Sequence, residues 1–111
     1  MEVIKTGKEQ GAVILAVKGR IDSVAAPEFG KQMDDLINQG ETRIIFNLSE
    51  LDYISSAGLR CILLMAKNLK EKKGKIVLAA VKPSVMKVFE ISGFSSIIPI
   101  SNSIEAALAQ L

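Results

Sequence analysis

Two adjacent serines, Ser55 and Ser56, precede two small residues, Ala57 and Gly58, at the start of an apolar helical pattern. A serine at this position is a good N-cap, because its hydroxyl accepts a hydrogen bond from a free backbone N–H. The same position also favours a phosphate, since unpaired N–H groups and the positive end of the helix dipole attract an anion. The pair therefore has two interpretations, a plain helix cap and a hydroxyl that accepts a phosphate.

Gly58 stands inside the first turn of this predicted helix. A glycine there costs about 1 kcal/mol relative to alanine. The cost is easier to understand if another backbone or a bulky group must come close to the helix at this point. We therefore expect a close approach at Gly58.

The other candidate residues have simpler interpretations. Asp22 follows a strand and is typical of a turn, and the pair Asp34 and Asp35 fits a solvated helix face. Cys61 lies in an apolar helical pattern and fits the core, because the chain has no histidine to activate its thiol. The basic cluster at 67–75 fits a solvated helix end, where cations suit the negative end of the dipole.

The absence of histidine narrows the chemistry further. It excludes a Ser-His-Asp triad, a histidine phosphorelay and a histidine-ligated zinc site. A single cysteine excludes an intramolecular disulfide and a four-thiolate metal site, and it fits a reducing compartment. Nothing matches the glycine-rich phosphate-binding patterns GxxxxGK[ST] or GxGxxG. We therefore expect no catalytic residue, no cofactor and no metal.

Composition indicates a small globular protein. The 111 residues include 14 Lys and Arg against 12 Asp and Glu, and this even balance gives no electrostatic argument for nucleic acid binding. The first residues lack the apolar region of a signal peptide, and no apolar stretch approaches the roughly 20 residues that span a bilayer. We expect one domain over residues 1–111, monomeric when free, cytoplasmic and not inserted in a membrane.

Apolar runs rich in β-branched residues predict strands that are covered on both faces, at 12–17, 43–48 and 75–81. A short strand at 2–6 and a turn at 7–11 predict an antiparallel hairpin with the first of these runs. Residues 97–100 predict a last strand, whose proline favours a sheet edge. We interpret residues 19–23 as a loop and residues 49–54 as a connection.

Apolar residues at helical spacing predict helices that begin near Pro27, Ser55, Pro83 and Ser103. Strands that alternate with helices favour an α/β sandwich, a mostly parallel sheet packed by about four helices. Sites in such sheets gather where strands end, so we expect Asp22 and Ser56 to lie close together. The expected core contains Val13, Leu15, Val17, Ile44, Phe46, Leu63, Val77, Leu78 and Phe89.

Several motifs in chain order carry a resemblance to a known family. They are Gly19-Arg20-Ile21-Asp22, Asn47-Leu48, Tyr53-Ile54-Ser55-Ser56-Ala57-Gly58-Leu59, and Lys82-Pro83-Ser84-Val85 with Phe89, Ser92 and Gly93. Over essentially its whole length the chain resembles the STAS domain, in particular the stand-alone anti-sigma factor antagonists of bacteria. The resemblance implies a STAS-type sandwich with an N-terminal antiparallel hairpin.

The resemblance also implies a phosphorylation switch. In this family a serine kinase, which is also the anti-sigma factor, phosphorylates one serine of the antagonist. The unphosphorylated antagonist binds the kinase and frees the sigma factor, and a PP2C-type phosphatase reverses the modification. The modified serine corresponds to Ser56, and Asp22 matches an acidic loop residue beside it. The implied partner-binding residues are Asp22, Ser23, Ser55, Ala57, Gly58 and Leu59.

Two positions depart from the family pattern. Ser55 stands where the family often has aspartate directly before the modified serine. Arg60 stands where the family often has glycine. The first departure removes a negative charge beside the site and makes Ser55 the alternative phosphate acceptor.

Two other roles are compatible with these residues. STAS domains also serve as scaffold subunits of signalling complexes and as soluble partners of lipid or anion transport systems. Neighbouring genes distinguish these roles: a kinase and a sigma factor for the antagonist, permease genes for the transport partner. A small enzyme such as a nucleotide hydrolase is disfavoured, because the chain has no histidine, no phosphate loop and no convergent acid–base pair.

Overall fold

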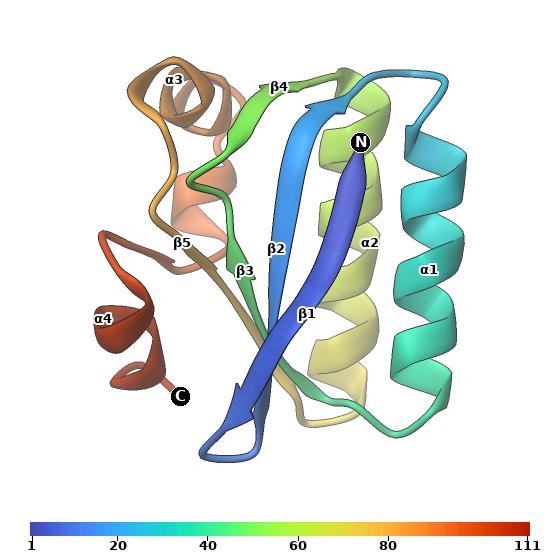
Figure 1. Ribbon diagram of the computed structural model, residues 1–111, viewed down its shortest axis with the longest axis vertical. Coiled ribbons are helices and arrows are strands. Elements are labelled where there is room, and N and C mark those ends of the chain that lie inside the picture. The colour runs from blue at the N-terminus through green and yellow to red at the C-terminus, as the bar shows by residue number, and fades with distance from the viewer.

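The computed structural model describes residues 1–111, apart from the side chain of Ser95. Figure 1 shows strands of a single twisted sheet with helices on both faces. The elements in chain order are β1 (Glu2–Glu9), β2 (Ala12–Ile21), α1 (Ala26–Asn38), β3 (Arg43–Asn47), β4 (Leu51–Ile54), α2 (Ser56–Glu71), β5 (Lys75–Ala79), α3 (Pro83–Ile91), the 3-10 helix η1 (Phe94–Ser96), β6 (Ile100–Ser101) and α4 (Ile104–Leu108).

The strands follow the order β1-β2-β3-β5-β6, and β4 pairs with β2 off this path. The β1–β2 pair is antiparallel, whereas β2, β3, β5 and β6 run parallel to one another. This arrangement confirms the predicted α/β sandwich with its N-terminal hairpin. Among the described residues, no helix combines the length and apolar character that crossing a bilayer requires.

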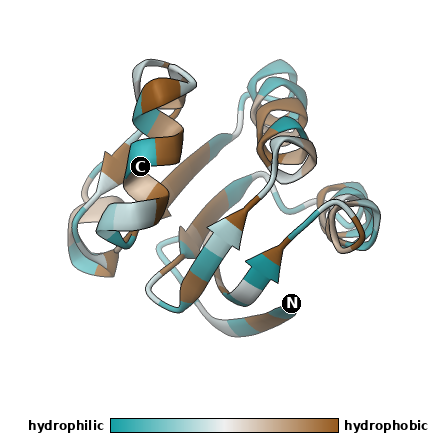
Figure 2. Ribbon diagram, turned by 90° about the horizontal axis from the view of Figure 1, so that it is seen from above, coloured by the Kyte–Doolittle hydropathy of each residue, from teal (hydrophilic) through white to brown (hydrophobic). Residues whose placement is uncertain are grey.

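Side chains alternate between the two faces of the sheet, as the period of a strand demands. Val13 and Leu15 of β2 face α1 and α2, whereas Ile14 between them belongs to the smaller cluster under α4. The view from above in Figure 2 shows this layering, with the pair α1 and α2 on one side of the sheet and α4 on the other. Because both faces are covered, these strands contain almost unbroken apolar runs.

The expected core is confirmed for every residue except Leu63. The buried face of α2 contains Leu59, Ile62, Met65 and Leu69, and Met65 is a core residue that the sequence pattern missed. Leu63 is only partly buried and packs at the margin of the core. The apolar face of α2 is wider than the part of the helix that packs on the sheet. Leu63 therefore lies at the edge of the contact between α2 and the sheet.

Two predicted connections were wrong. Residues 49–54 contain the strand β4, and β2 continues to Ile21 instead of ending at residue 17. The two differences have one cause: the extra residues of β2, Arg20 and Ile21, pair with β4 in parallel register. Gly19, with a φ of +86°, allows the bend at which β2 changes partner from β3 to β4.

The C-terminal region also differs from its prediction. The expected strand at 97–100 is shorter and displaced: residues 97–99 are not in a strand, and the strand that follows η1 is β6, Ile100–Ser101. Pro99 precedes this strand and, lacking an N–H, is compatible with the edge position that β6 occupies. The predicted start of the last helix near Ser103 is confirmed: Ser103 is the N-cap of α4, and the Ala106 N–H donates to Ser103 Oγ over 3.1 Å.

Candidate functional site

The two serines of the motif have different structural positions. Ser55 is the N-cap of α2, with an extended backbone, and the Gly58 N–H donates to its Oγ over 3.1 Å. Ser56 is the first residue of the helix and is exposed to solvent. The cap interpretation therefore holds for Ser55, and the free surface hydroxyl at the helix N-terminus belongs to Ser56.

The loop after β2 and the start of α2 lie side by side at one end of the sheet. Ile21, the last residue of β2, is in register with Ile54, the last residue of β4. The Ser55 N–H donates to the Ile21 carbonyl oxygen over 2.8 Å and ties the two chain segments together at this point. Asp22 follows Ile21 directly, and Ser56 follows Ile54 after one residue, Ser55. The ends of β2 and β4 and the start of α2 lie together at the upper edge of the molecule in Figure 1.

Asp22 organises the turn that leads into α1. Its Oδ1 accepts hydrogen bonds from the Val24 N–H over 3.1 Å and the Ala25 N–H over 2.8 Å. The Asp22 carbonyl oxygen then accepts from the Ala26 N–H over 2.9 Å. Asp22 thus has the turn role that its position after a strand indicates. Its side chain also remains partly exposed, so its charge is available at this edge of the sheet.

Gly58 is buried where α2 crosses the ends of β2 and β4. A Cβ at this position would lie 2.8 Å from Ile21 Cγ2, 2.8 Å from Ile54 Cγ1 and 3.2 Å from the Ile21 carbonyl oxygen. The close approach expected here is present, and the approaching groups belong to the chain itself. Gly58 therefore sets how tightly α2 packs on the sheet and lies beneath the surface that Ser56 presents.

We predict that Gly58→Ala destabilises the fold by about 1–2 kcal/mol, because the cost of overpacking exceeds the gain in helix propensity. Gly7→Ala is the matched control, since the same methyl group would meet nothing within 4 Å there. Urea denaturation of both variants measures the difference. An equal free energy of unfolding for the two variants would show that Gly58 is not sterically constrained.

The remaining residues of the predicted binding surface divide into exposed and buried ones. Ser23 and Ala57 are exposed beside Asp22 and Ser56. Leu59 is buried and contributes to the surface only as the floor of an open groove of about 560 Å³. The groove is lined by Ser56, Ala57, Leu59, Arg60, Leu63, Ser92 and Phe94.

Val24, Arg20 and Tyr53 are also exposed beside the site, and none of the three was among the predicted binding residues. Val24, with 85% of its surface exposed, stands in the loop that Asp22 organises. The Arg20 guanidinium carbon lies 4.2 Å from the ring centroid of Tyr53, a cation–π contact between β2 and β4. Only the pairing of β2 with β4 places Arg20 next to Tyr53, so no local pattern could have indicated this contact.

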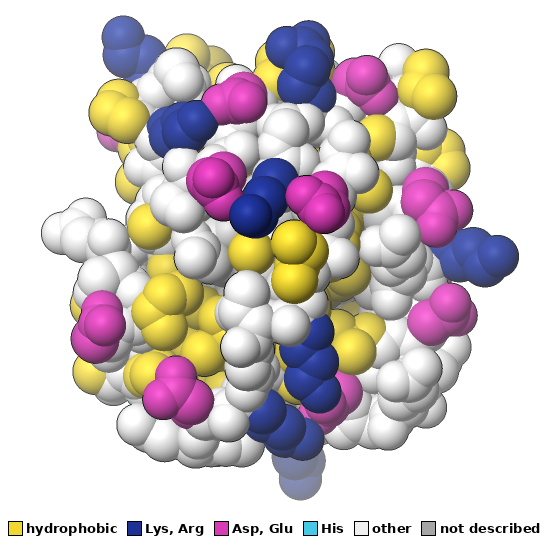
Figure 3. All heavy atoms as spheres, in the orientation of Figure 1, with side chains coloured by type: hydrophobic (Ala, Val, Ile, Leu, Met, Phe, Trp, Pro, Cys, Tyr) yellow, Lys and Arg dark blue, Asp and Glu magenta, His cyan; other side chains and the backbone are white. Residues whose placement is uncertain are grey.

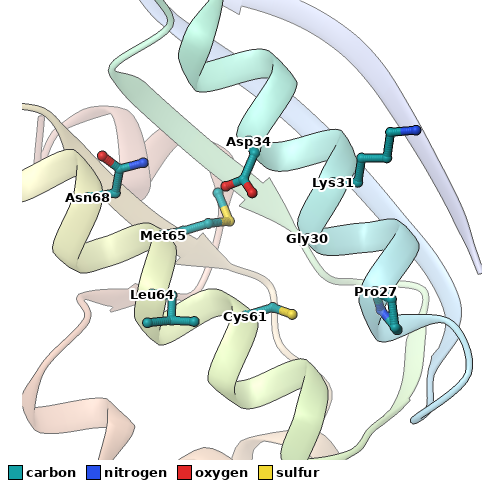
Figure 4. Close-up of a pocket in the computed structure, with 8 residues that line it drawn as sticks. All are labelled: Pro27, Gly30, Lys31, Asp34, Cys61, Leu64, Met65 and Asn68. Atoms are coloured by element: carbon teal, nitrogen blue, oxygen red, sulfur yellow. The ribbon is translucent and has the colours of Figure 1, made fainter.

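Cys61 lies on the opposite side of α2 from this groove, in a cavity of about 470 Å³ between α1 and α2 (Figure 4). It is half-buried, and its Sγ donates to the Ala26 carbonyl oxygen over 3.4 Å. Burial raises the pKa of the Cys61 thiol, and the nearby Asp34 carboxylate raises it further. A raised pKa keeps the thiol protonated at neutral pH, which argues against a nucleophilic role.

The family model of the STAS domain matches residues 4–107. The chain belongs to the STAS domain family. Among proteins similar to this STAS domain, BtrV of Bordetella bronchiseptica, named as an anti-sigma factor antagonist, is 46% identical over 92% of this chain and 88% of its own length. The anti-sigma F factor antagonist of Paenibacillus polymyxa is 28% identical over 97% of this chain and 93% of its own length.

Solved structures share the fold of this STAS domain. A Thermotoga maritima protein described as an anti-sigma factor antagonist has a TM-score of 0.89 at 24% identity, over 94% of this chain and 90% of its own. The phosphorylated form of Bacillus SpoIIAA has a TM-score of 0.75 at 24% identity, over 98% of both chains. A sulfate transporter family protein of Wolinella succinogenes has a TM-score of 0.78 at 17% identity, over 95% of this chain and 88% of its own. The STAS fold therefore occurs in more than one functional setting.

Proposed function

We propose that this STAS domain is an anti-sigma factor antagonist that acts by binding and not by catalysis. Its unphosphorylated form binds an anti-sigma factor that is also a serine kinase, and this binding frees the sigma factor. Phosphorylation of Ser56 switches the antagonist off, and a PP2C-type phosphatase restores it. Residues 1–111 act as one domain, monomeric when free, in the cytoplasm where sigma factors work. The relatives named as antagonists support this role.

The observation that carries the proposal is that the two serines have different structural positions. Ser56 presents an exposed hydroxyl at the first position of α2, whereas the hydroxyl of Ser55 is held in the helix cap. A kinase reaches Ser56 without disturbing the fold. The Ser56 oxygen attacks the γ-phosphorus of ATP, its proton passes to a base of the kinase, and ADP leaves.

The binding surface that we propose surrounds this hydroxyl. Ala57 and the loop residues Asp22 and Ser23 lie at the same edge of the sheet, and their small or short side chains permit close approach by a partner. Ser55, Gly58 and Leu59 support this surface from beneath, through the helix cap and the packing of α2.

The test is to combine the purified protein with the kinase-type anti-sigma factor encoded in the same genome, together with its sigma factor. We expect the protein to bind the anti-sigma factor in size-exclusion chromatography and to displace the sigma factor. Addition of ATP should dissociate the complex and place the phosphate on Ser56, as mapped by mass spectrometry. A sigma factor that stays bound to the anti-sigma factor at saturating antagonist would contradict the proposal.

Asp22 tests recognition separately from folding. Asp22→Asn keeps a side-chain oxygen for the Val24 and Ala25 N–H groups and removes the charge, so we expect nearly unchanged thermal stability and weaker binding of the anti-sigma factor. Asp22→Ala is the control for the turn, because it removes the acceptor as well and should cost about 0.5–2 kcal/mol. Calorimetric titration and thermal melts measure both effects. If the asparagine variant melts several degrees earlier but binds normally, Asp22 has only its turn role.

A role beside a transport system is the second candidate, because a sulfate transporter family protein has the same fold. In that role Ser56 needs no kinase, and the partner is a membrane permease or its regulator. Permease genes beside this one, together with no phosphate on any serine after incubation with the neighbouring kinase, would favour this candidate over the antagonist.

A further inference from the structure

A long groove follows α2 from Ser56 toward its C-terminal end. Three adjoining hollows of about 560, 390 and 280 Å³ form it, because the first two share Leu63 and the last two share Ala66, Lys70 and Ile97. Lys70 lies 14 residues after Ser56 in α2, which corresponds to about 21 Å along the helix. The opposite wall is the segment 92–99, which contains η1. We call this surface the α2 groove.

The charged residues of the α2 groove all have the same sign. Arg60, Lys67, Lys70 and Lys75 line it, and none of its described lining residues is acidic. The whole chain, by contrast, has nearly equal numbers of basic and acidic residues, and the face seen in Figure 3 shows the two kinds interspersed. The cavity between α1 and α2 also contains both signs, Lys31 and Asp34. The concentration of positive charge is therefore a local property of the α2 groove.

The floor of the α2 groove is apolar. Leu63 and Ala66 are only partly covered by the rest of the fold, and Ile97 is 59% exposed. Leu59, Phe94 and Ile98 are buried beneath them. An apolar floor between cationic rims complements an amphipathic segment whose polar side is acidic.

We propose that the α2 groove binds an acidic amphipathic segment of the anti-sigma factor, in addition to the contacts around Ser56. Apolar side chains of the segment pack on Leu63 and Ile97, and its carboxylates pair with Lys67 and Lys70. The identity of the partner rests on the function proposed above. The chemistry of the segment rests on the charge and floor of the groove alone.

The α2 groove also connects this contact with the serine switch. Ser56 and Arg60 lie one helical turn apart and line the same end of the groove. A phosphate on Ser56 carries a charge of about −1.5 to −2. It neutralises Arg60 and repels an acidic segment at the entrance to the groove. One modification therefore acts on both parts of the binding surface.

The test uses charge reversal at the end of the groove away from the serine. In the double variant Lys67→Glu/Lys70→Glu, we expect the affinity for the anti-sigma factor to fall about tenfold at low salt, with a weaker salt dependence than wild type. Lys5→Glu/Lys31→Glu is the matched control, because it changes the net charge equally on exposed residues outside the groove. A third variant, Ile97→Ser, tests the apolar floor and should also weaken binding. Calorimetric titration at two salt concentrations measures all three.

Three outcomes overturn the proposal. If Lys67→Glu/Lys70→Glu binds like wild type while phosphorylation of Ser56 still abolishes binding, the groove is not used and the antagonist function stands. If both charge-reversal pairs lose affinity equally, net charge and not the α2 groove is responsible. If wild type binds no anti-sigma factor from the same genome, the proposed function fails and the groove loses its partner with it.

Discussion

Phosphorylation of Ser56 is expected to lower the affinity for the anti-sigma factor by more than about tenfold without unfolding the domain. The phosphate adds a charge of about −1.5 to −2 at neutral pH. Ser56 is the first residue of α2, where a negative charge favours the helix dipole by about 0.3–1 kcal/mol at an exposed site. Local melting of α2 is therefore not the physical basis of the switch.

The loss of affinity comes from the interface itself. Ser56 and the adjacent Ala57 are exposed and would lie against the kinase. A dianion enclosed there must lose its water, and without a cation on the kinase to pair with it this costs several kcal/mol. The same charge repels acidic groups of the kinase, including the segment that we propose for the α2 groove.

Three protein forms measure this effect. Ser56→Ala should fold, bind the anti-sigma factor and accept no phosphate. Ser56→Asp should inhibit binding only in part, because a carboxylate has less charge and fewer acceptor oxygens than a phosphate. The phosphorylated wild type should show the full loss in calorimetric titration, with a melting temperature no lower than that of the unmodified protein.

Mapping the phosphorylated residue by mass spectrometry shows whether Ser55 or Ser56 accepts the phosphate. Ser55→Ala removes the N-cap of α2 and should cost about 0.5–2 kcal/mol, whereas Ser56→Ala removes no cap. Phosphate found on Ser55 with Ser56 unmodified would show that the correspondence with the family motif is shifted by one residue. A large drop in melting temperature on phosphorylation of Ser56 would show that the switch acts by unfolding.

Truncation of Leu69 is expected to have the largest effect on stability, a loss of about 2–5 kcal/mol for Leu69→Ala. Leu69 is completely buried in the main core, so the substitution leaves a cavity that the surrounding side chains can fill only in part. Denaturation by urea, followed by circular dichroism, gives the free energy of unfolding. A loss below about 0.5 kcal/mol, the scale of ordinary surface substitutions, would show that Leu69 is not in the core.

Leu63→Ala is the matched control on the same helix. Leu63 is only partly buried and lines the α2 groove, so the stability loss should be clearly smaller than for Leu69→Ala. The same variant should weaken binding of the anti-sigma factor, because it removes part of the apolar floor. Equal stability losses for the two leucines would contradict the placement of Leu63 at the margin of the core.

The parts of the fold that could be predicted from sequence are those with a local cause. The apolar runs of β2, β3 and β5 indicate parallel strands, because such strands are covered on both faces and have no polar side to alternate with. The cap at Ser103 was also predictable, since it depends on a hydroxyl and an N–H three residues apart. The helix position of the Ser55–Ser56 pair follows from the same local rules.

The contacts missed by the sequence prediction are those between distant segments. The four-residue strand β4 exists because it extends the ladder of β2 beyond the end of β3, and its own residues are too few to show a period. How much of α2 is buried depends on the sheet against which it packs. The helix pattern alone therefore could not show that Met65 is more deeply buried than Leu63.

The sequence by itself therefore determined the types and order of the longer elements, without β4, and the motif with its two serines. Local rules left open which of the two serines caps the helix. The tertiary structure decided this through the hydrogen bond from the Ser55 N–H to the Ile21 carbonyl oxygen, which leaves Ser56 exposed, and it placed Ile21 and Ile54 against Gly58. It also decided that Arg60, Lys67 and Lys70 share one groove with Ile97. The physical reason is the range of the interactions. Caps and periodicity act within one or two turns of chain, whereas strand pairing and helix packing join residues that only the folded chain brings together.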